Sequence, residues 1–205
     1  MYRNIKRRCG PSHAGVRSVG FRARVEAMQR LEIRHTWDGA PARPGERVRL
    51  ELALEPQVLR VGVDAPYHGD PPPPGPAGPT DGLWEFEVVE LFVLQDRVPG
   101  TPRYTEIELG PHGHHLVLQL AGIRTVVKSG LPLPYQTTRA PGADRPRWRG
   151  EARLDASLLP PPPHRLNAYA IHGVGASRRY LALYPGPTSA RPDFHRLETF
   201  QPARW

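Results

Sequence analysis

Four glutamates near the middle of the chain are the first candidates for chemistry. They are Glu87, Glu90, Glu106 and Glu108. Glu90 interrupts the apolar run at 88–94, where an unpaired buried carboxylate is too costly to keep. Such oxygens can bind sugar hydroxyls or a hard cation such as calcium. The alternative is a set of salt bridges to arginines of neighbouring segments, namely Arg47, Arg49 or Arg60.

Paired carboxylates also raise the possibility of glycoside hydrolysis. Glu106 and Glu108 are two residues apart on a predicted strand, so their backbone positions are about 7 Å apart on one face. This spacing fixes neither the separation of the carboxyl groups nor the presence of a cleft. The sequence contains no Gly-rich phosphate loop and no nucleophile elbow. We therefore assign no catalytic residue and expect a non-catalytic protein.

Three histidines, His112, His114 and His115, occupy one predicted turn. A His-Gly-His-His run can bind zinc or nickel, with His172, His195 or Glu106 as a further ligand, but such sites also need an oriented second shell. The alternative is an accidental cluster of turn histidines. We expect no cofactor, and we leave a bound metal ion open.

Aromatic side chains complete the candidate site. Trp37 and Trp84 could stack on a sugar ring, or they could cap the ends of the core. Strand parity places Tyr104 on the face of Glu106, and a register slip of one residue would reverse that face. We hypothesise that one pocket is lined by Trp84, Glu90, Tyr104, Glu106 and His112. Further candidates for ligand binding are Glu87, His172 and Tyr184.

The elements that must position these residues are strands. The segment 83–121 contains three extended stretches separated by Pro/Gly-rich connections, which is typical of an antiparallel meander. The run 88–94 is apolar at almost every position, so we expect a central strand that is buried on both faces.

The remaining periodicity is also that of strands. Apolar and polar residues alternate over 31–36, 47–55, 59–64 and 147–155. A strand pair is expected at 166–172 and 180–184, around Gly173-Val174-Gly175, and short strands at a sheet edge are expected at 123–128 and 133–138. Asp155 is suited to cap one helical turn over 156–159. The sequence predicts an all-β fold: an antiparallel, jelly-roll-like β-sandwich of about ten short strands, with at most one or two short helical turns.

Length and charge indicate one domain with a basic N-terminal segment. Residues 1–28 contain seven basic residues and one acidic residue, a net charge of +6 out of the total of +8. We interpret 1–28 as a disordered basic tail or a mis-assigned start, 29–200 as a single β-sandwich domain, and 201–205 as a C-terminal tail. The nearly neutral domain argues against specific nucleic-acid binding. No apolar run is long enough for a membrane span, and the single cysteine, Cys9, excludes an intramolecular disulfide framework. We expect a cytoplasmic protein and leave its oligomeric state open.

Six motifs in order resemble those of a small family of functionally uncharacterised proteins with animal and bacterial members. They are His35-Thr36-Trp37-Asp38-Gly39, Leu83-Trp84-Glu85-Phe86-Glu87-Val88-Val89-Glu90, Glu108-Leu109-Gly110-Pro111-His112-Gly113, Ala170-Ile171-His172-Gly173, Ala182-Leu183-Tyr184-Pro185 and Pro192-Asp193-Phe194-His195. The domain of that family is similar to family 9 carbohydrate-binding modules and to DOMON-like β-sandwiches. The resemblance implies a sandwich with a groove in which aromatic side chains stack on sugar rings, although relatives also bind haem or act as docking modules.

Three functions remain open on the sequence. The first is a non-catalytic binding module for a carbohydrate or another small polar ligand. The second is a metal-dependent enzyme of unknown substrate that uses the turn of His112, His114 and His115. The third is a protein-interaction scaffold without a small ligand, to which the proline-rich loops would contribute.

Overall fold

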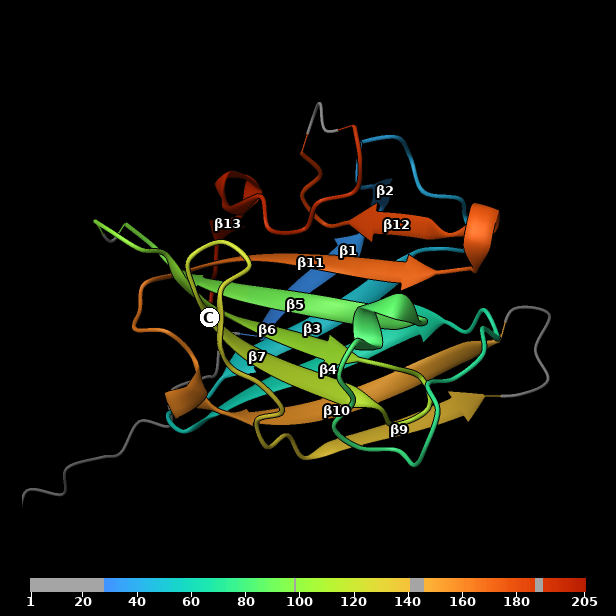
Figure 1. The fold of residues 1–205 in the computed structure, drawn as a ribbon, viewed down its shortest axis with the longest axis horizontal. Coiled ribbons are helices and arrows are strands. Elements are labelled where there is room, and N and C mark those ends of the chain that lie inside the picture. Colours follow the sequence, from blue (N-terminus) through green and yellow to red (C-terminus); the bar gives the residue numbers. More distant parts are fainter. Residues whose placement is uncertain (1–27, 98, 141–145, 187–189) are drawn as a thin grey trace, which may run out of the picture.

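The structure, a computed structural model, describes residues 28–97, 99–140, 146–186 and 190–205. The predicted tail therefore lies outside the described residues up to residue 27, and Met28 begins the first strand. Two antiparallel sheets pack face to face, one behind the other in the view of Figure 1. The predicted antiparallel β-sandwich is confirmed.

The first sheet has five strands. Their order is β1 (Met28–Ile33), β3 (Val48–Leu54), β4 (Val58–Pro66), β10 (Arg147–Asp155) and β9 (Tyr135–Ala140). Buried and exposed positions alternate strictly along most of β10, as the period-two pattern of the sequence requires for a sheet with one wet face. Its apolar face contributes to the core between the sheets.

The second sheet has eight strands. Seven follow in the order β2 (His35–Thr36), β12 (Arg179–Ala182), β11 (His164–His172), β5 (Val88–Gln95), β6 (Arg103–Leu109), β7 (His115–Ala121) and β8 (Val126–Lys128), and β13 (Gln201–Pro202) pairs with β11. Because β5, β6 and β7 are consecutive antiparallel neighbours, the meander predicted for 83–121 is confirmed.

Strand β5 lies between β11 and β6, and its first seven residues are buried. Val89, Leu91 and Val93 point into the core between the two sheets. Val88, Phe92 and Leu94 belong to a second apolar cluster, on the outer face of the eight-stranded sheet. The expectation of a central strand buried on both faces is therefore confirmed.

Short 3-10 turns and loops cover the outer face of this sheet. The turn η1 (Leu83–Glu85) lies in front of the sheet in Figure 1, and η4 (Leu197–Thr199) packs beside the same apolar cluster. Two further turns are η2 (Ala156–Leu158) and η3 (Gly175–Ser177). The carboxylate of Asp155 caps η2 by accepting the Ser157 N–H at 2.9 Å, as the sequence suggested. Among the described residues, no helix is long and apolar enough to cross a membrane.

The C-terminal residues differ from the expectation of a tail. Gln201 and Pro202 form β13 on β11, and the Arg204 N–H donates to the side-chain oxygen of Gln29 at 2.9 Å. The Trp205 ring lies 5.9 Å from the ring of His164, centre to centre, and packs against the core. Residues 201–205 therefore belong to the sandwich, because the terminal indole buries apolar surface that a free tail would leave in water.

Candidate functional site

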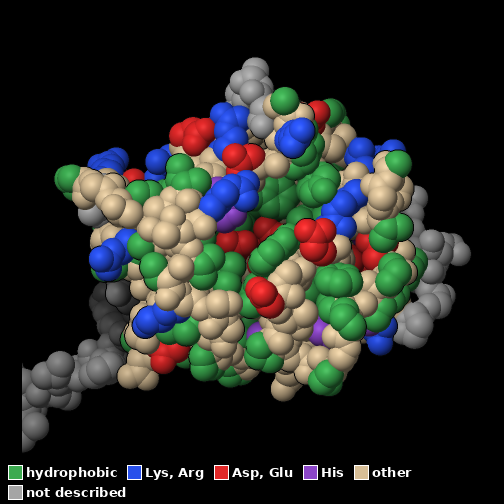
Figure 2. Space-filling model, in the orientation of Figure 1, with side chains coloured by type: hydrophobic (Ala, Val, Ile, Leu, Met, Phe, Trp, Pro, Cys, Tyr) green, Lys and Arg blue, Asp and Glu red, His purple; other side chains and the backbone are tan. Residues whose placement is uncertain are grey.

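A pocket of about 370 Å³ opens on the outer face of the eight-stranded sheet, between η1 and the loop that precedes η4. Figure 2 shows acidic side chains recessed near the middle of this face, with basic side chains on either side. A larger hollow, of about 580 Å³, lies over the outer face of the five-stranded sheet. Its walls hold charged side chains that already have partners, such as Asp64, which accepts from Arg147 at 2.6 Å, and no aromatic side chain lines it. The smaller hollow is therefore the candidate site, and it is called the pocket below.

Glutamates form the floor of the pocket. Glu90 on β5 and Glu106 on β6 line it, and Glu108 lies directly opposite Glu90 in the strand register. All three side chains point to the outer face of the sheet because they occupy matched positions of adjacent antiparallel strands. They are nevertheless buried, with exposures of 2%, 4% and 0% for Glu90, Glu106 and Glu108.

These carboxyl groups lack ordinary partners. Glu90 Oε1, Glu106 Oε2 and both carboxyl oxygens of Glu108 find no hydrogen-bond donor among the described residues. Glu106 and Glu108 are close enough to bond each other when one of them carries a proton. Unpaired buried oxygens are rare in folded proteins and call for an explanation such as a ligand or a functional role.

Burial determines the protonation of this floor. It raises the pKa of Glu106 to about 7. It also raises the pKa values of Glu90 and Glu108 well above their usual range, and the neighbouring carboxylates raise them further. Both effects disfavour the charged form: apolar surroundings solvate a carboxylate poorly, and neighbouring carboxylates repel each other. Near neutral pH the floor therefore retains protons.

Aromatic side chains form part of the pocket wall. Trp84 of η1, Tyr180 of β12 and Phe194 of the C-terminal loop line it. The Trp84 side chain is 40% exposed, so it is a wall of the pocket and not a plug of the core. Arg178 fixes η1 to the sheet, because its guanidinium group donates to the carbonyl oxygens of Trp84 and Glu85. The same group lies 5.6 Å from the centre of the Tyr180 ring.

Tyr104 lies beneath the pocket and does not line it, since it is only 1% exposed. Its hydroxyl oxygen accepts the Arg124 N–H at 3.0 Å and lies 2.7 Å from Nδ1 of His195. The hydroxyl and Nδ1 share a hydrogen bond whose direction is set by the tautomer of the ring. Burial, with help from Arg124, lowers the pKa of His195 to about 4, consistent with a neutral ring.

The five residues hypothesised to line one pocket are only partly brought together. Trp84, Glu90 and Glu106 line the pocket, and Tyr104 supports it from below through His195. His112 lies elsewhere, with its Nε2 at 3.4 Å from the Tyr67 hydroxyl and its Nδ1 at 3.1 Å from Arg139. Sequence reasoning did not expect Arg124, Arg178, Tyr180 and Phe194 in the pocket, and it considered His195 only as a further metal ligand. The motif Pro192-Asp193-Phe194-His195 was the signal that could have pointed to two of them.

The salt bridges expected as an alternative for the glutamates are wrong. Arg49 pairs with Glu32 at 3.5 Å, and Arg60 pairs with Glu55 at 3.5 Å and with Glu151 at 3.9 Å. These arginines lie on the five-stranded sheet, whereas Glu90, Glu106 and Glu108 lie on the far face of the other sheet. Glu87 instead accepts the backbone N–H groups of His68 and Asp70. Strand parity places a side chain on one face of a strand but does not say which sheet contains the strand.

The histidine turn does not form a metal site. His114 is buried and neither of its ring nitrogens has a hydrogen-bond partner among the described residues, while His115 begins β7 and lies against the ring of Tyr135. In the part of the chain that the structure describes, no three His, Cys, Asp or Glu side chains gather in a way that could hold a metal ion. Glu106 is instead part of the pocket.

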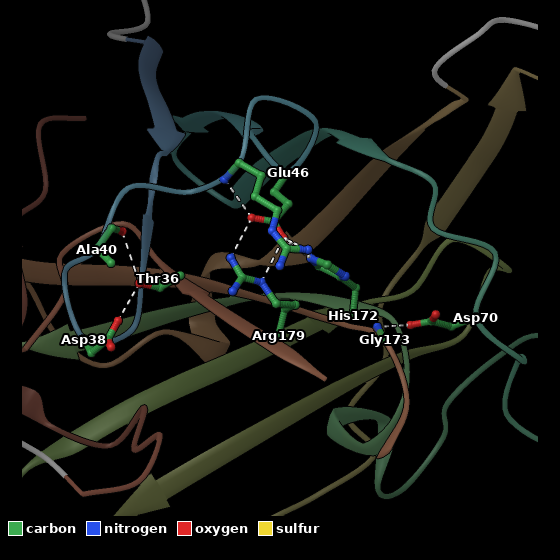
Figure 3. Close-up of polar contacts among 9 residues, drawn as sticks. Thr36, Asp38, Ala40, Glu46, Asp70, His172, Gly173 and Arg179 are labelled. Atoms are coloured by element: carbon green, nitrogen blue, oxygen red, sulfur yellow. Dashed lines mark hydrogen bonds and ion pairs between the residues drawn. The ribbon is translucent and has the colours of Figure 1, made fainter. Parts of the chain in front are cut away.

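His172 belongs to a second polar cluster with Glu46 and Arg179 (Figure 3). Glu87 lies beside this cluster. Glu46 is 4% exposed and accepts two bonds from Arg179, both at 2.9 Å. His172 Nε2 lies 3.4 Å from Glu46, and its ring stacks on that of His68 at 3.6 Å between centres. Burial and the neighbouring His68 lower the pKa of His172 to about 4. This cluster is a packed internal network.

Two further candidates also have internal partners. Glu87 accepts the backbone N–H groups of His68 at 3.0 Å and Asp70 at 3.4 Å, and burial raises its pKa to about 7. The backbone of Tyr184 both donates to and accepts from the amide side chain of Asn167, a fully buried residue that sequence reasoning did not single out. Neither residue lines the pocket.

Comparison with known proteins identifies the family. The mouse UPF0462 protein C4orf33 homolog is 45% identical over 179 residues, which cover 84% of this chain and 89% of that protein. The human UPF0462 protein C4orf33 is 42% identical over 178 residues, covering 83% of this chain and 85% of that protein. The chain belongs to the UPF0462 family. The family membership expected from the sequence motifs is thus confirmed, although no protein-family model matches the chain.

A solved structure shares the fold of this UPF0462 protein. The crystal structure of a proposed carbohydrate-binding protein from Bacteroides uniformis matches with a TM-score of 0.64 at 16% identity, covering 86% of this chain and 85% of that chain. A family 9 carbohydrate-binding module from Caldicellulosiruptor kristjanssonii in complex with cellotriose matches with a TM-score of 0.44 at 13% identity, over 78% of this chain and 72% of that chain. At these identities the likeness concerns the fold alone.

Proposed function

We propose that this UPF0462 protein is a non-catalytic binding module that holds a carbohydrate, or another small polyhydroxylated molecule, in the pocket. The observation that carries the proposal is the pairing of an aromatic wall with unpartnered carboxyl oxygens. Trp84 offers a half-exposed indole, and Glu90 and Glu106 offer buried oxygens without donors. A sugar ring has an apolar face for the first and hydroxyl donors for the second.

The size and surroundings of the pocket support a small ligand. Its volume of about 370 Å³ is near the lower end of the range for small-molecule sites, about 300–1,000 Å³. Leu118, Leu120 and Ile171 line it beside the aromatic residues, so most of its wall is apolar with a few convergent polar groups. The fold shared with the Bacteroides uniformis protein is compatible with the same role, but it does not by itself define a ligand.

The two alternatives from the sequence have less support. A metal-dependent enzyme would need a ligand set, and none exists among the described residues. A protein-interaction scaffold would use exposed apolar side chains, and Ile123, Val126 and Val127 of the β7–β8 hairpin are 60%, 48% and 57% exposed. These three residues carry no feature that selects a partner, so we retain the pocket as the functional site.

A glycan array followed by calorimetric titration tests the proposal. The full chain should bind at least one mono- or disaccharide, and Trp84→Ala should weaken that binding about tenfold, since stacking contributes roughly 1–2 kcal/mol. Trp205→Ala is the matched control, because Trp205 packs against His164 and does not line the pocket. Binding that Trp84→Ala leaves unchanged would place the sugar elsewhere and refute the assignment.

A further inference from the structure

The floor of the pocket consists of acidic side chains, and the two arginines that line the pocket, Arg124 and Arg178, donate to other acceptors. Glu90 Oε1 and Glu106 Oε2 have no donor among the described residues, and both side chains are more than nine-tenths buried. Glu108 stands behind them with both oxygens also unpartnered. Whatever fills the pocket must bring donors to these oxygens, because a buried acceptor without a donor costs free energy.

The charged groups around Glu90 and Glu106 come from every element packed on this face. They are Glu108 on β6, Asp81 and Glu85 around η1, Arg124 after β7, Arg178 before β12 and His195 in the C-terminal loop. The cations are engaged elsewhere: Arg124 donates to Asp193 at 2.7 Å, and Arg178 donates to the carbonyl oxygens of Trp84 and Glu85. Burial, with help from Arg124, lowers the pKa of His195 to about 4, so its ring is neutral near pH 7. The floor therefore has more acidic groups than available cations.

The walls of the pocket also favour a positively charged ligand. Trp84, Tyr180 and Phe194 present aromatic rings around the acidic floor. The faces of such rings attract cations, most strongly where water is excluded, and they also stack on apolar sugar faces. A ligand that combines a sugar ring with a positive charge satisfies the walls and the floor together.

We propose that the pocket is specific for an amino sugar with a free, protonated amine, whose ammonium group donates to Glu90 and Glu106 while the ring lies against Trp84. This inference rests on the proposed function, carbohydrate binding in the pocket, and names the class of sugar. An ammonium group supplies three donors and one positive charge, which a neutral hydroxyl cannot. Hydrogen bonds between charged partners are roughly twice as strong as those between neutral ones.

Binding of such a ligand is coupled to proton release. Burial raises the pKa of Glu106 to about 7 and that of Glu90 well above its usual range, so the unliganded floor holds protons at pH 6.5. An ammonium group favours the carboxylate form and so displaces these protons to the solvent. The protons released on binding do not come from Tyr104 or Tyr169, since burial raises the pKa of both hydroxyls.

Calorimetry of the full chain at pH 6.5 with glucosamine, N-acetylglucosamine and glucose tests this specificity. Glucosamine should bind about tenfold more tightly than the other two sugars, because acetylation removes the charge and glucose replaces the amine with a hydroxyl. The binding enthalpy of glucosamine should also differ between phosphate and imidazole buffers, as proton release requires. Equal affinities for the three sugars would overturn the amino-sugar inference and leave carbohydrate binding intact. Failure of all three to bind would also overturn the amino-sugar inference, and the glycan array would then decide separately whether the protein binds carbohydrate.

Glu106→Gln supplies the matched variant, with Glu151→Gln on the outer face of the other sheet as its control. Glu106→Gln should abolish the preference for glucosamine, and Glu151→Gln should keep it. Thermal melts verify that both variants fold, and Glu90→Gln provides the same test if Glu106→Gln does not. A preference for glucosamine that survives both pocket variants would show that the amine binds outside the floor, contrary to the proposal.

Discussion

The substitution Glu106→Gln should stabilise the protein at alkaline pH and have little effect near pH 5. Glu106 is 4% exposed, and burial raises its pKa from an ordinary value of 4.5 to about 7. The unfolded chain therefore loses this proton near pH 4.5, whereas the folded protein keeps it until about pH 7. Because the folded state binds the proton more tightly, the free energy of unfolding falls as the pH rises through this window.

The size of the effect follows from the same two values. The interval from 4.5 to about 7, at about 1.4 kcal/mol for each unit, gives an upper limit of about 3.5 kcal/mol for the cost of the ionised Glu106 above pH 7. Glutamine has no such cost, and its amide can donate to the unpartnered oxygens of Glu108. The variant should therefore gain up to about 3.5 kcal/mol over the wild type at pH 8.

Urea unfolding at pH 5 and pH 8 measures this difference directly. The control is Glu151→Gln, whose parent side chain is 63% exposed, so its stability difference from the wild type should not change by more than about 0.5 kcal/mol between the two pH values. If Glu106→Gln were equally destabilised at pH 5 and pH 8, the carboxyl would have a structural bonding partner, and the reasoning about the floor would be refuted.

Three further substitutions test the pocket wall, the second polar cluster and the core. Trp84→Ala should lower the free energy of unfolding by less than about 2 kcal/mol, because the indole is 40% exposed, and a loss of 3–5 kcal/mol in urea unfolding would instead identify a core residue. Arg179→Ala should cost about 3–5 kcal/mol by leaving Glu46 buried without its two bonds, while Arg30→Ala, which removes an exposed ion pair, should cost less than about 1 kcal/mol. Gly150→Ala should lower the melting temperature, because the added Cβ would lie within 2.9 Å of two aromatic side chains; an unchanged melting temperature would show that the core has room there.

The fold was largely readable from the sequence because its signals are local. Strict alternation marked β10, and the unbroken apolar run marked β5 as the strand buried on both faces. The sequence did not separate β2 from β1, because 31–36 was predicted as one strand, and it did not predict β13. Both short elements have two residues and are defined by their partners β12 and β11. A pairing that depends on a distant partner leaves no periodic pattern of its own.

The site could be predicted only in part, because contacts between residues that are distant in the sequence leave no local pattern. Strand parity and the antiparallel register place Glu90, Glu106 and Glu108 on one face, as the alternation of side chains requires. Which other residues lie in or beside the pocket depends on the path of the loops. His112 was expected in the pocket because its turn follows β6, but the turn carries it toward Arg139. His195, by contrast, is 91 residues away from Tyr104 in the chain and lies against it.

The most direct test of ligand binding in the pocket is the indole N–H spectrum of the ¹⁵N-labelled protein during titration with glucosamine and, separately, with glucose. The chain has four tryptophans, so each indole gives one assignable signal. The account predicts that the Trp84 signal shifts with saturation while the signal of Trp148, which is 1% exposed in the core, stays in place. A Trp84 signal that remains unchanged in both titrations, at sugar concentrations that shift other signals of the protein, would contradict it.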